Sequence, residues 1–135
     1  MVQNIKQSYR YCRSVTKHAS STFYLASFLC SKDVRQDLYA VYAFCRIADD
    51  LADAPGLDDD RRRRELDLLS RTLRTKRYTE DDMLWPAFFD TIERRGIPLH
   101  YFDEILKGVM SDIDPHTPKN IQELEHYSYL VAGVV

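Results

Sequence analysis

Residues 42–53 read YAFCRIADDLAD, and this stretch decides how the rest of the chain is interpreted. Arg46, Asp49, Asp50 and Asp53 are spaced at i, i+3, i+4 and i+7, so a helix places them on one face. Carboxylates one helical turn apart repel each other, and a cation is expected to compensate them. Arg46 can neutralise one of these charges. The remaining oxygen-rich acidity suits Mg²⁺ better than Zn²⁺.

The side chains around the acids are mostly apolar and cover most of the helix circumference. We therefore expect this helix to be buried on nearly all sides, with its carboxylates facing a polar cavity. The alternative is a solvated charged face, which is the usual environment of surface carboxylates. The apolar neighbours that favour the cavity are Leu38, Tyr39, Val41, Tyr42, Phe44, Cys45, Ile47 and Leu51.

The composition predicts one all-α unit over residues 1–135. The 135 residues are 44% hydrophobic and 30% charged, with only four Gly and five Pro, and the apolar residues recur at helical spacing. A net charge of −2 gives no electrostatic argument for nucleic-acid binding. Three cysteines without a CxxC motif predict reduced, buried thiols and a cytoplasmic location. No signal peptide or membrane-spanning run is recognised, while peripheral membrane contact through one helix stays open.

Caps and helix breakers divide the chain. Ser31 is a good N-cap for the acidic helix, which should end near Ala54 before Pro55 and Gly56. Further helices are expected over residues 5–17 and 85–95, from Pro98 onward, and from a capping box at residues 120–123. The arginines at 61–64 follow three aspartates, which favours a salt-bridged helix start over a diphosphate site. The buried stripe of that helix is predicted to be Leu66, Leu69 and Leu73.

Four segments, in order, resemble the squalene and phytoene synthase family: SSTFYLAS at 20–27, YAFCRIADDLAD at 42–53, GVMSD at 108–112 and YSYLVAG at 127–133. The second is the most specific, and the resemblance extends over residues 9–135. It implies an all-α helical bundle of the isoprenoid-synthase type. The family's second Asp-rich motif lies beyond the Val-Ala-Gly segment, after which this sequence stops. We therefore expect a domain truncated to its N-terminal half, with little or no activity without its missing C-terminal half.

The resemblance implies a Mg²⁺-dependent prenyltransferase. Such an enzyme joins two farnesyl or geranylgeranyl diphosphates head to head, through a cyclopropylcarbinyl diphosphate, to a squalene- or phytoene-type hydrocarbon. NADPH is implied only for a squalene-type member. Two alternatives stay open: a single-substrate isoprenoid synthase or cyclase of the same fold, and a non-catalytic relative that serves in assembly or binding.

Site residues are carried over from the matching motifs. The resemblance implies that Asp49, Asp50 and Asp53 bind Mg²⁺ and diphosphate, with Arg46 orienting the cluster or contacting diphosphate. Thr22 stands where the family usually has a second Ser, and Ser128 where it usually has Cys. Helix capping for Ser20 and Thr22, a cap or surface position for Asp112, and helix packing for Val131 and Ala132 remain alternatives. The implied substrate-binding residues are Ser20, Thr22, Phe23, Tyr42, Asp112, Tyr127, Val131 and Ala132.

Overall fold

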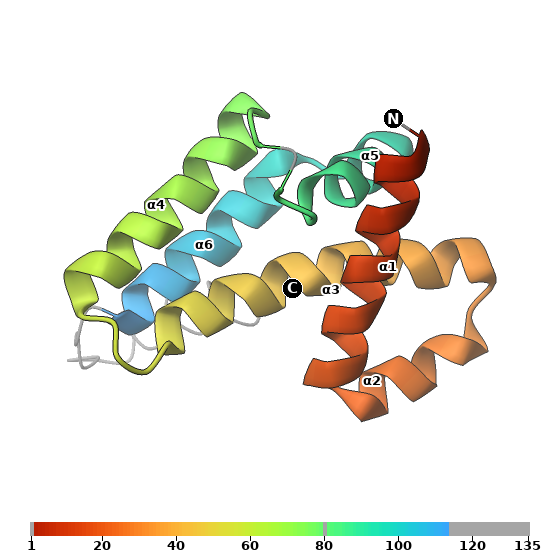
Figure 1. Ribbon diagram of the computed structural model, residues 1–135, viewed down its shortest axis with the longest axis horizontal. Coiled ribbons are helices and arrows are strands. Elements are labelled where there is room, and N and C mark those ends of the chain that lie inside the picture. Colours follow the sequence, from red (N-terminus) through yellow and green to blue (C-terminus); the bar gives the residue numbers. More distant parts are fainter. Residues whose placement is uncertain (1, 80, 114–135) are drawn as a thin grey trace. The chain divides into compact units, whose positions relative to one another are not determined.

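The computed structural model describes residues 2–79 and 81–113, and the regular structure in these ranges is entirely helical (Figure 1). This confirms the all-α prediction for the described part of the chain. The predicted helix at residues 120–135 lies outside it. The elements are α1 (Val2–Ala19), α2 (Ser21–Ala26), the short 3₁₀ helix η1 (Ser27–Leu29), α3 (Lys32–Asp53), α4 (Asp59–Thr75), α5 (Trp85–Arg95) and α6 (Leu99–Ile113).

The helix ends follow local chemistry that the sequence displays. The Asp58 side chain accepts a hydrogen bond from the Arg61 backbone N–H at 2.8 Å and so caps α4. Gly96 ends α5 in the left-handed region, at φ 64°. The helix predicted at residues 5–17 is longer, Val2–Ala19, and its end is set by Ser20, whose extended backbone breaks the helix.

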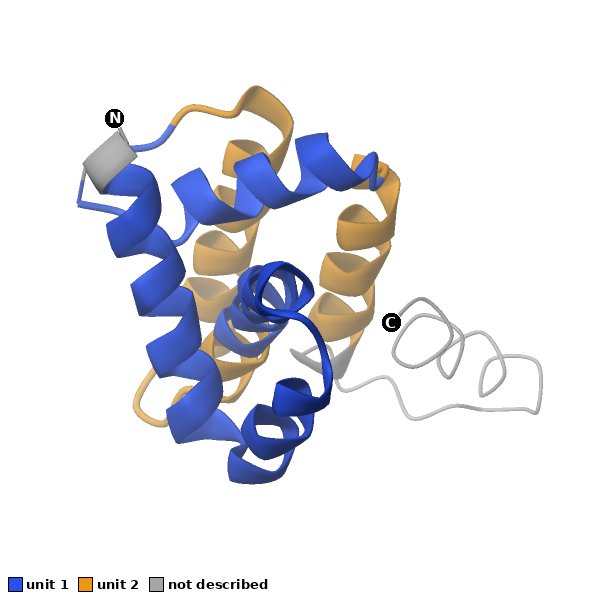
Figure 2. Ribbon diagram, turned by 90° about the vertical axis from the view of Figure 1, so that its right-hand side faces the viewer, with its two compact units in different colours: residues 1–47, 78–97 blue, residues 48–77, 98–135 orange. Residues whose placement is uncertain are grey.

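The described residues separate into two units, which Figure 2 shows in different colours. Unit 1 comprises residues 1–47 and 78–97 and holds α1, α2, η1, α5 and the first part of α3. Unit 2 comprises residues 48–77 and 98–135, with the end of α3, α4 and α6. The single unit expected over residues 1–135 stays a prediction.

An aromatic cluster forms the core of unit 1. The Phe44 ring from α3 stacks on Phe88 of α5, with centroids 4.8 Å apart, and meets Trp85 edge-on at 6.1 Å. Trp85 in turn stacks on Phe89 at 5.3 Å. All four side chains are buried, and each such ring pair adds about 0.5–1.5 kcal/mol beyond the area that it buries. The cluster therefore fixes α3 against α5.

The start of α5 is capped by a residue from another helix. Leu84, at the N-cap position, has no side-chain oxygen to offer. The buried hydroxyl of Ser8, on α1, accepts a hydrogen bond from the Ala87 backbone N–H at 2.8 Å and donates toward the carbonyl oxygens of Met83 and Leu84. Ser8 thus satisfies a first-turn N–H that would otherwise lack a partner.

In unit 2, α4 and α6 pack side by side (Figure 1). Each contributes one apolar stripe at helical spacing. The predicted stripe of α4 is confirmed. The buried residues are Leu66, Leu69 and Leu73 on α4 and Phe102, Ile105, Leu106 and Val109 on α6.

The arginine run at the start of α4 forms local ion pairs, as predicted. Arg62 pairs with Asp59 at 3.0 Å and Arg63 with Asp60 at 3.4 Å. Arg62 also donates to the Ala54 carbonyl oxygen, just past the end of α3, at 2.8 Å. This bond stabilises the turn between the acidic helix and α4.

All three cysteines are free thiols, but the expectation that all are buried is wrong for two of them. Cys12 is buried, whereas Cys30 and Cys45 are half-buried. Burial raises the pKa of the Cys12 thiol to about 12, which leaves it protonated at neutral pH.

Candidate functional site

The candidate metal-binding residues lie on one uninterrupted helix, α3. At 3.6 residues per turn, Tyr42, Arg46, Asp49, Asp50 and Asp53 fall within an arc of about 100°. All three carboxylates are exposed, and Tyr42 and Arg46 are half-buried. The helix therefore presents a tyrosine, an arginine and three acids along one stripe.

The expectation that this helix is buried on nearly all sides is wrong. Its buried face is mainly small, because four of its six buried apolar residues after Leu38 are alanines. Leu38, Val41, Tyr42, Cys45, Ile47 and Leu51 are only half-buried. Alanines let neighbouring helices approach one face closely. The arc that carries the acids stays accessible to solvent.

A magnesium ion fits this donor set only as an ion shared with another ligand. Among the described residues, no three His, Cys, Asp or Glu side chains gather closely enough to hold a metal ion. Mg²⁺ usually keeps several waters and binds one or two carboxylates together with substrate phosphates. Exposed aspartates one turn apart, at Asp49 and Asp53, match that mode of binding better than a cage made by protein alone.

Helix α2 brings two predicted substrate-binding residues together. The Phe23 ring stacks on Tyr42 of α3, with centroids 4.8 Å apart and planes inclined by 20°. The Ser20 hydroxyl accepts a hydrogen bond from the Phe23 backbone N–H at 3.2 Å, so the capping alternative for Ser20 is confirmed. Thr22 is exposed. The Phe23–Tyr42 pair begins the stripe that continues into Arg46 and the acids.

A second set of contacts, which joins α2 and η1 to α3 and α1, was not predicted. Tyr24 stacks on Tyr39, with ring centroids 5.8 Å apart, and the Ser27 hydroxyl lies 2.7 Å from the Tyr39 hydroxyl. Arg13 of α1 donates to the Tyr24 hydroxyl at 2.8 Å. These contacts hold α2 in place and thereby position Phe23 against Tyr42.

The remaining predicted residues are not brought into this stripe by the described structure. Asp112 lies on α6, and its side chain is outside the described set. Tyr127, Val131 and Ala132 also lie outside the described residues. Their roles stay predictions.

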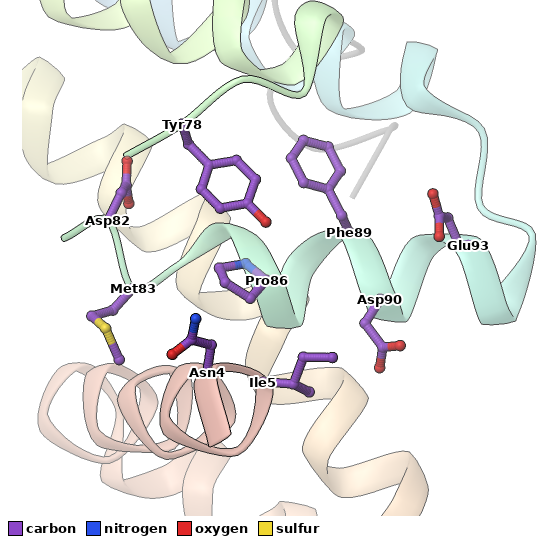
Figure 3. A pocket seen from close by; sticks show the side chains of 9 residues that line it. All are labelled: Asn4, Ile5, Tyr78, Asp82, Met83, Pro86, Phe89, Asp90 and Glu93. Carbon is purple, nitrogen blue, oxygen red and sulfur yellow. The ribbon is translucent and has the colours of Figure 1, made fainter. Parts of the chain in front are cut away.

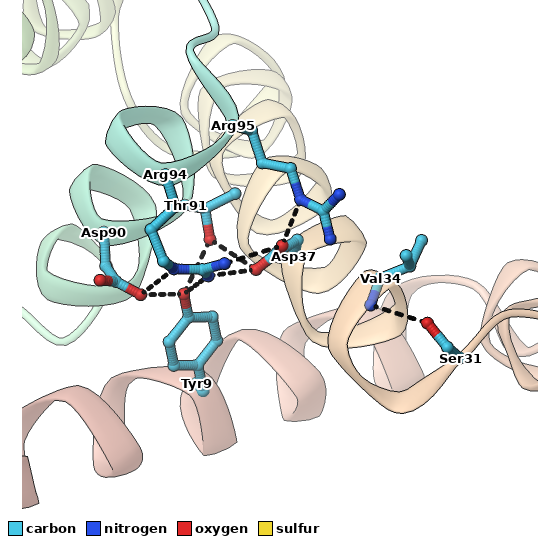
Figure 4. A network of polar contacts seen from close by, with 8 residues as sticks. All are labelled: Tyr9, Ser31, Val34, Asp37, Asp90, Thr91, Arg94 and Arg95. Carbon is cyan, nitrogen blue, oxygen red and sulfur yellow. Dashed lines mark hydrogen bonds and ion pairs between the residues drawn. The ribbon is translucent and has the colours of Figure 1, made fainter.

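An ionic network around the buried Asp37 carboxylate fixes the first part of α3 in unit 1 (Figure 4). Asp37, whose side chain is 8% exposed, accepts hydrogen bonds from Arg94 and Arg95 of α5, each at 2.6 Å, and from Thr91 at 3.2 Å. The Tyr9 hydroxyl of α1 donates to Asp90 at 2.6 Å and accepts from Arg94 at 2.8 Å. Three helices are thus joined through one carboxylate and its arginines.

The network changes the acidity of its members. Burial by itself raises the pKa of Asp37, but the hydrogen bonds from Arg94 and Arg95 outweigh it and leave that pKa below its usual value. Burial, with the nearby Asp90 carboxylate, raises the pKa of Tyr9 to about 12. Asp37 is therefore ionised and Tyr9 neutral at pH 7. The sequence gives one signal of this network: on a helix, Asp37 lies one turn from the apolar residues Val34, Ala40 and Val41.

The pocket in Figure 3 contains none of the predicted site residues. It has a volume of about 380 Å³, and two of its acids already have structural partners: Asp82 accepts from the Trp85 indole N–H at 2.7 Å, and Asp90 pairs with Arg94 at 3.0 Å. We assign it no chemistry. Its lining residues are Asn4, Ile5, Tyr78, Asp82, Met83, Pro86, Phe89, Asp90 and Glu93.

Across the described ranges, no helix is both long enough and apolar enough to cross a membrane.

Comparison with known proteins gives consistent relatives. Phytoene synthase 1 of Zea mays is 32% identical over 138 residues, which cover 97% of this chain and 32% of the maize protein. The 15-cis-phytoene synthase of Synechococcus elongatus is 29% identical over 133 residues, which cover 98% of this chain and 43% of the Synechococcus protein. Among solved structures, a dehydrosqualene synthase in complex with ligand matches with a TM-score of 0.82, at 34% identity, over 98% of this chain and 46% of that protein.

Squalene synthase HpnC from Alicyclobacillus acidocaldarius matches with a TM-score of 0.83, at 26% identity, over 96% of this chain and 49% of the other. The chain thus spans about a third to a half of the length of these relatives. The family model described as squalene/phytoene synthase matches residues 16–135. With most of its length matched, the chain belongs to the squalene/phytoene synthase family.

Proposed function

We propose that this chain supplies one diphosphate-binding face of a head-to-head prenyltransferase. The observation that carries the proposal is the stripe on α3, in which Tyr42, Arg46 and the three aspartates share one accessible face of a continuous helix. The family's members join two prenyl diphosphates, and an anionic leaving group needs such a face. Membership of the family supports this use of the acids over a solvated charged surface.

Each residue of the stripe has a proposed task. Asp49, Asp50 and Asp53 bind Mg²⁺ jointly with the diphosphate, while Arg46 contacts the diphosphate oxygens and limits repulsion among the acids. When bound there, Mg²⁺ supplies charge neutralisation that makes diphosphate a better leaving group. The half-buried Tyr42 lies at the apolar end of the stripe, where a prenyl chain would extend.

The stacked rings of Phe23 and Tyr42 are proposed to line the hydrocarbon side of the site. Aromatic faces stabilise an allylic cation by cation–π attraction, and their bulk keeps out water that would quench it. The alkene of a second prenyl chain then attacks the cation, and loss of a proton closes a cyclopropylcarbinyl diphosphate. This intermediate releases its own diphosphate and rearranges to a second allylic cation, which loses a proton to give a phytoene-type product or accepts hydride from a nicotinamide cofactor to give a squalene-type product. A nicotinamide reductant is needed only for the squalene-type outcome.

Diphosphate binding tests the assignment of the acids. Calorimetric titration of the purified chain with inorganic diphosphate is expected to show Mg²⁺-dependent binding that weakens at least tenfold in the Asp49→Asn/Asp53→Asn double variant. Asp67→Asn, which removes an exposed carboxylate of α4, is the control and should bind like wild type. Equal binding by wild type and the double variant would refute the role of these aspartates.

Product analysis tests the reaction. We expect the 135 residues alone to give little or no product from farnesyl or geranylgeranyl diphosphate, because they span only about a third to a half of the length of the relatives. Magnesium-dependent product from the purified chain would contradict this expectation. If a longer chain that includes these residues forms product from a single prenyl diphosphate, the cyclase alternative replaces the head-to-head reaction.

A further inference from the structure

The start of the chain has a charge pattern that the proposed prenyltransferase site does not use. The first 32 residues contain five Lys or Arg and no Asp or Glu, a formal charge of +5 in a chain whose net charge is −2. Four of these cations, Lys6, Arg10, Arg13 and Lys17, recur at i, i+4, i+7 and i+11 of α1. They therefore form one basic stripe along that helix.

The stripe borders two hollows between α1 and the first part of α3, both within unit 1. The first, of about 450 Å³, is lined by Lys6, Tyr9, Arg10, Arg13, Lys32, Gln36 and Tyr39. The second, of about 250 Å³, shares Arg13, Lys32, Gln36 and Tyr39 with the first and adds Phe28 and Arg35. The two hollows are therefore adjacent, and none of the described residues that line them is acidic.

An apolar tip adjoins the second hollow. It consists of three side chains around the junction of α2 and η1: Leu25, Phe28 and Leu29, which are 68%, 49% and 92% exposed. The Arg35 guanidinium lies 4.6 Å from the centre of the Phe28 ring, so cations and apolar side chains meet directly. Large apolar side chains clustered at the surface indicate a contact with an apolar partner.

We propose that this surface, the basic hollows together with the apolar tip, docks the protein on a membrane that contains anionic phospholipid. Lipid phosphates would bind Lys6, Arg10 and Lys32, while Leu25 and Leu29 enter the interface between headgroups and acyl chains. A free phosphate would satisfy the cations but leave the exposed leucines in water. A lipid surface complements both the charge and the apolar tip.

Vesicle co-sedimentation of the purified chain tests the proposal. We expect binding to vesicles rich in phosphatidylglycerol, weak binding to pure phosphatidylcholine, and loss of binding at high salt. The triple variant Lys6→Glu/Arg10→Glu/Lys32→Glu should lower the partition coefficient by about 100-fold or more, at about fivefold for each cation removed. Its matched control is Arg61→Glu/Arg64→Glu/Arg71→Glu, which makes the same charge change on exposed positions of α4 and should bind nearly as wild type.

The apolar tip is tested separately. Leu25→Ser/Leu29→Ser should lower the partition coefficient at least tenfold, whereas Leu68→Ser, at a 54% exposed position of α4, should not. Lys6→Arg/Lys32→Arg keeps the charge and should retain binding, which separates loss of charge from loss of fold. Circular dichroism of each variant checks that the helices persist.

Three results would overturn the proposal. They are no sedimentation of wild type with phosphatidylglycerol vesicles at low salt, equal loss of binding in the α4 control, and competition by inorganic phosphate with no effect of the leucine substitutions. A concentration-dependent increase in mass that the leucine variants abolish, without vesicle binding, would instead assign the surface to a second copy of the chain. The diphosphate-binding experiment uses other residues, so either proposal can fail alone.

Discussion

Asp37→Asn is the substitution for which the structure gives the clearest expected magnitude. The carboxylate is 8% exposed and accepts four hydrogen bonds: two from Arg94, at 2.6 and 3.4 Å, one from Arg95 at 2.6 Å, and one from Thr91 at 3.2 Å. The amide keeps the shape of the side chain but loses the charge. One carboxylate oxygen is replaced by an NH2 group, which is a hydrogen-bond donor and faces an arginine N–H, also a donor.

The expected loss of stability follows from these contacts. A hydrogen bond to a charged group contributes about 1.5–3 kcal/mol when buried, but both arginines are nearly half exposed, at 48% and 42%, so solvent screening reduces each contribution to about 1 kcal/mol. Arg94 also keeps its bonds to Asp90 and Tyr9. We therefore expect Asp37→Asn to lower the free energy of unfolding by about 2 kcal/mol at pH 7.

The pH dependence gives an independent check. The folded-state pKa of Asp37 is lowered, so its stabilisation is fully present above the unfolded-state pKa of about 3.9 and is lost as the pH falls through the folded-state value. Urea unfolding followed by circular dichroism at pH 7 should show the full difference between wild type and variant. The difference should shrink as the pH is lowered below about 4.

The control for this experiment is Asp81→Asn, an exposed position in the same unit, which should unfold like wild type at every pH. A difference of less than about 0.5 kcal/mol between wild type and Asp37→Asn at pH 7 would refute the energetic role of the network. A difference that persists unchanged at acid pH would show that shape, rather than charge, is responsible.

Three further predictions concern single sites. Gly96→Ala should lower the free energy of unfolding by about 1 kcal/mol because φ is 64°, whereas Lys76→Gly, at φ 58°, should raise it by about 0.5–1 kcal/mol in the same urea titrations. Ser8→Ala should cost about 1–3 kcal/mol and speed hydrogen exchange at the Ala87 amide, and unchanged exchange would contradict the capping role. Thiol titration at pH 8 should modify Cys30 but leave Cys12 unreacted until the chain unfolds, because burial raises the Cys12 pKa to about 12.

Local signals in the sequence predicted most of the helix ends. Ser20, Asp58 and Gly96 each act within three or four residues of the helix end that they set, so their roles can be recognised without knowledge of the tertiary structure. The helix predicted at residues 85–95 is confirmed at both ends. Pro86 lies in its first turn, where a proline is tolerated.

Contacts between distant residues could not be predicted in this way. The Asp37–Arg95 pair joins residues 58 positions apart, and the Ser8–Ala87 hydrogen bond joins residues 79 positions apart. The exposure of Asp49 and Asp53 was also missed, because apolar neighbours along a helix do not reveal how wide its buried face is. The stripe of charged residues on α3 was predicted correctly, since it depends only on helical spacing.

The Ser8 cap and the division of unit 1 into two sequence segments bear on synthesis by the ribosome. Helix α5 draws its first-turn hydrogen bond from a residue made 79 positions earlier, and residues 48–77 separate the two segments of unit 1. Nascent α1 can pack on α2 early, but it waits for α5 until residue 97 has left the exit tunnel. During that interval Ser8, Cys12 and Thr16, which the fold buries, are accessible to chaperones. We expect nascent chains that stop before residue 85 to be held by chaperones or degraded.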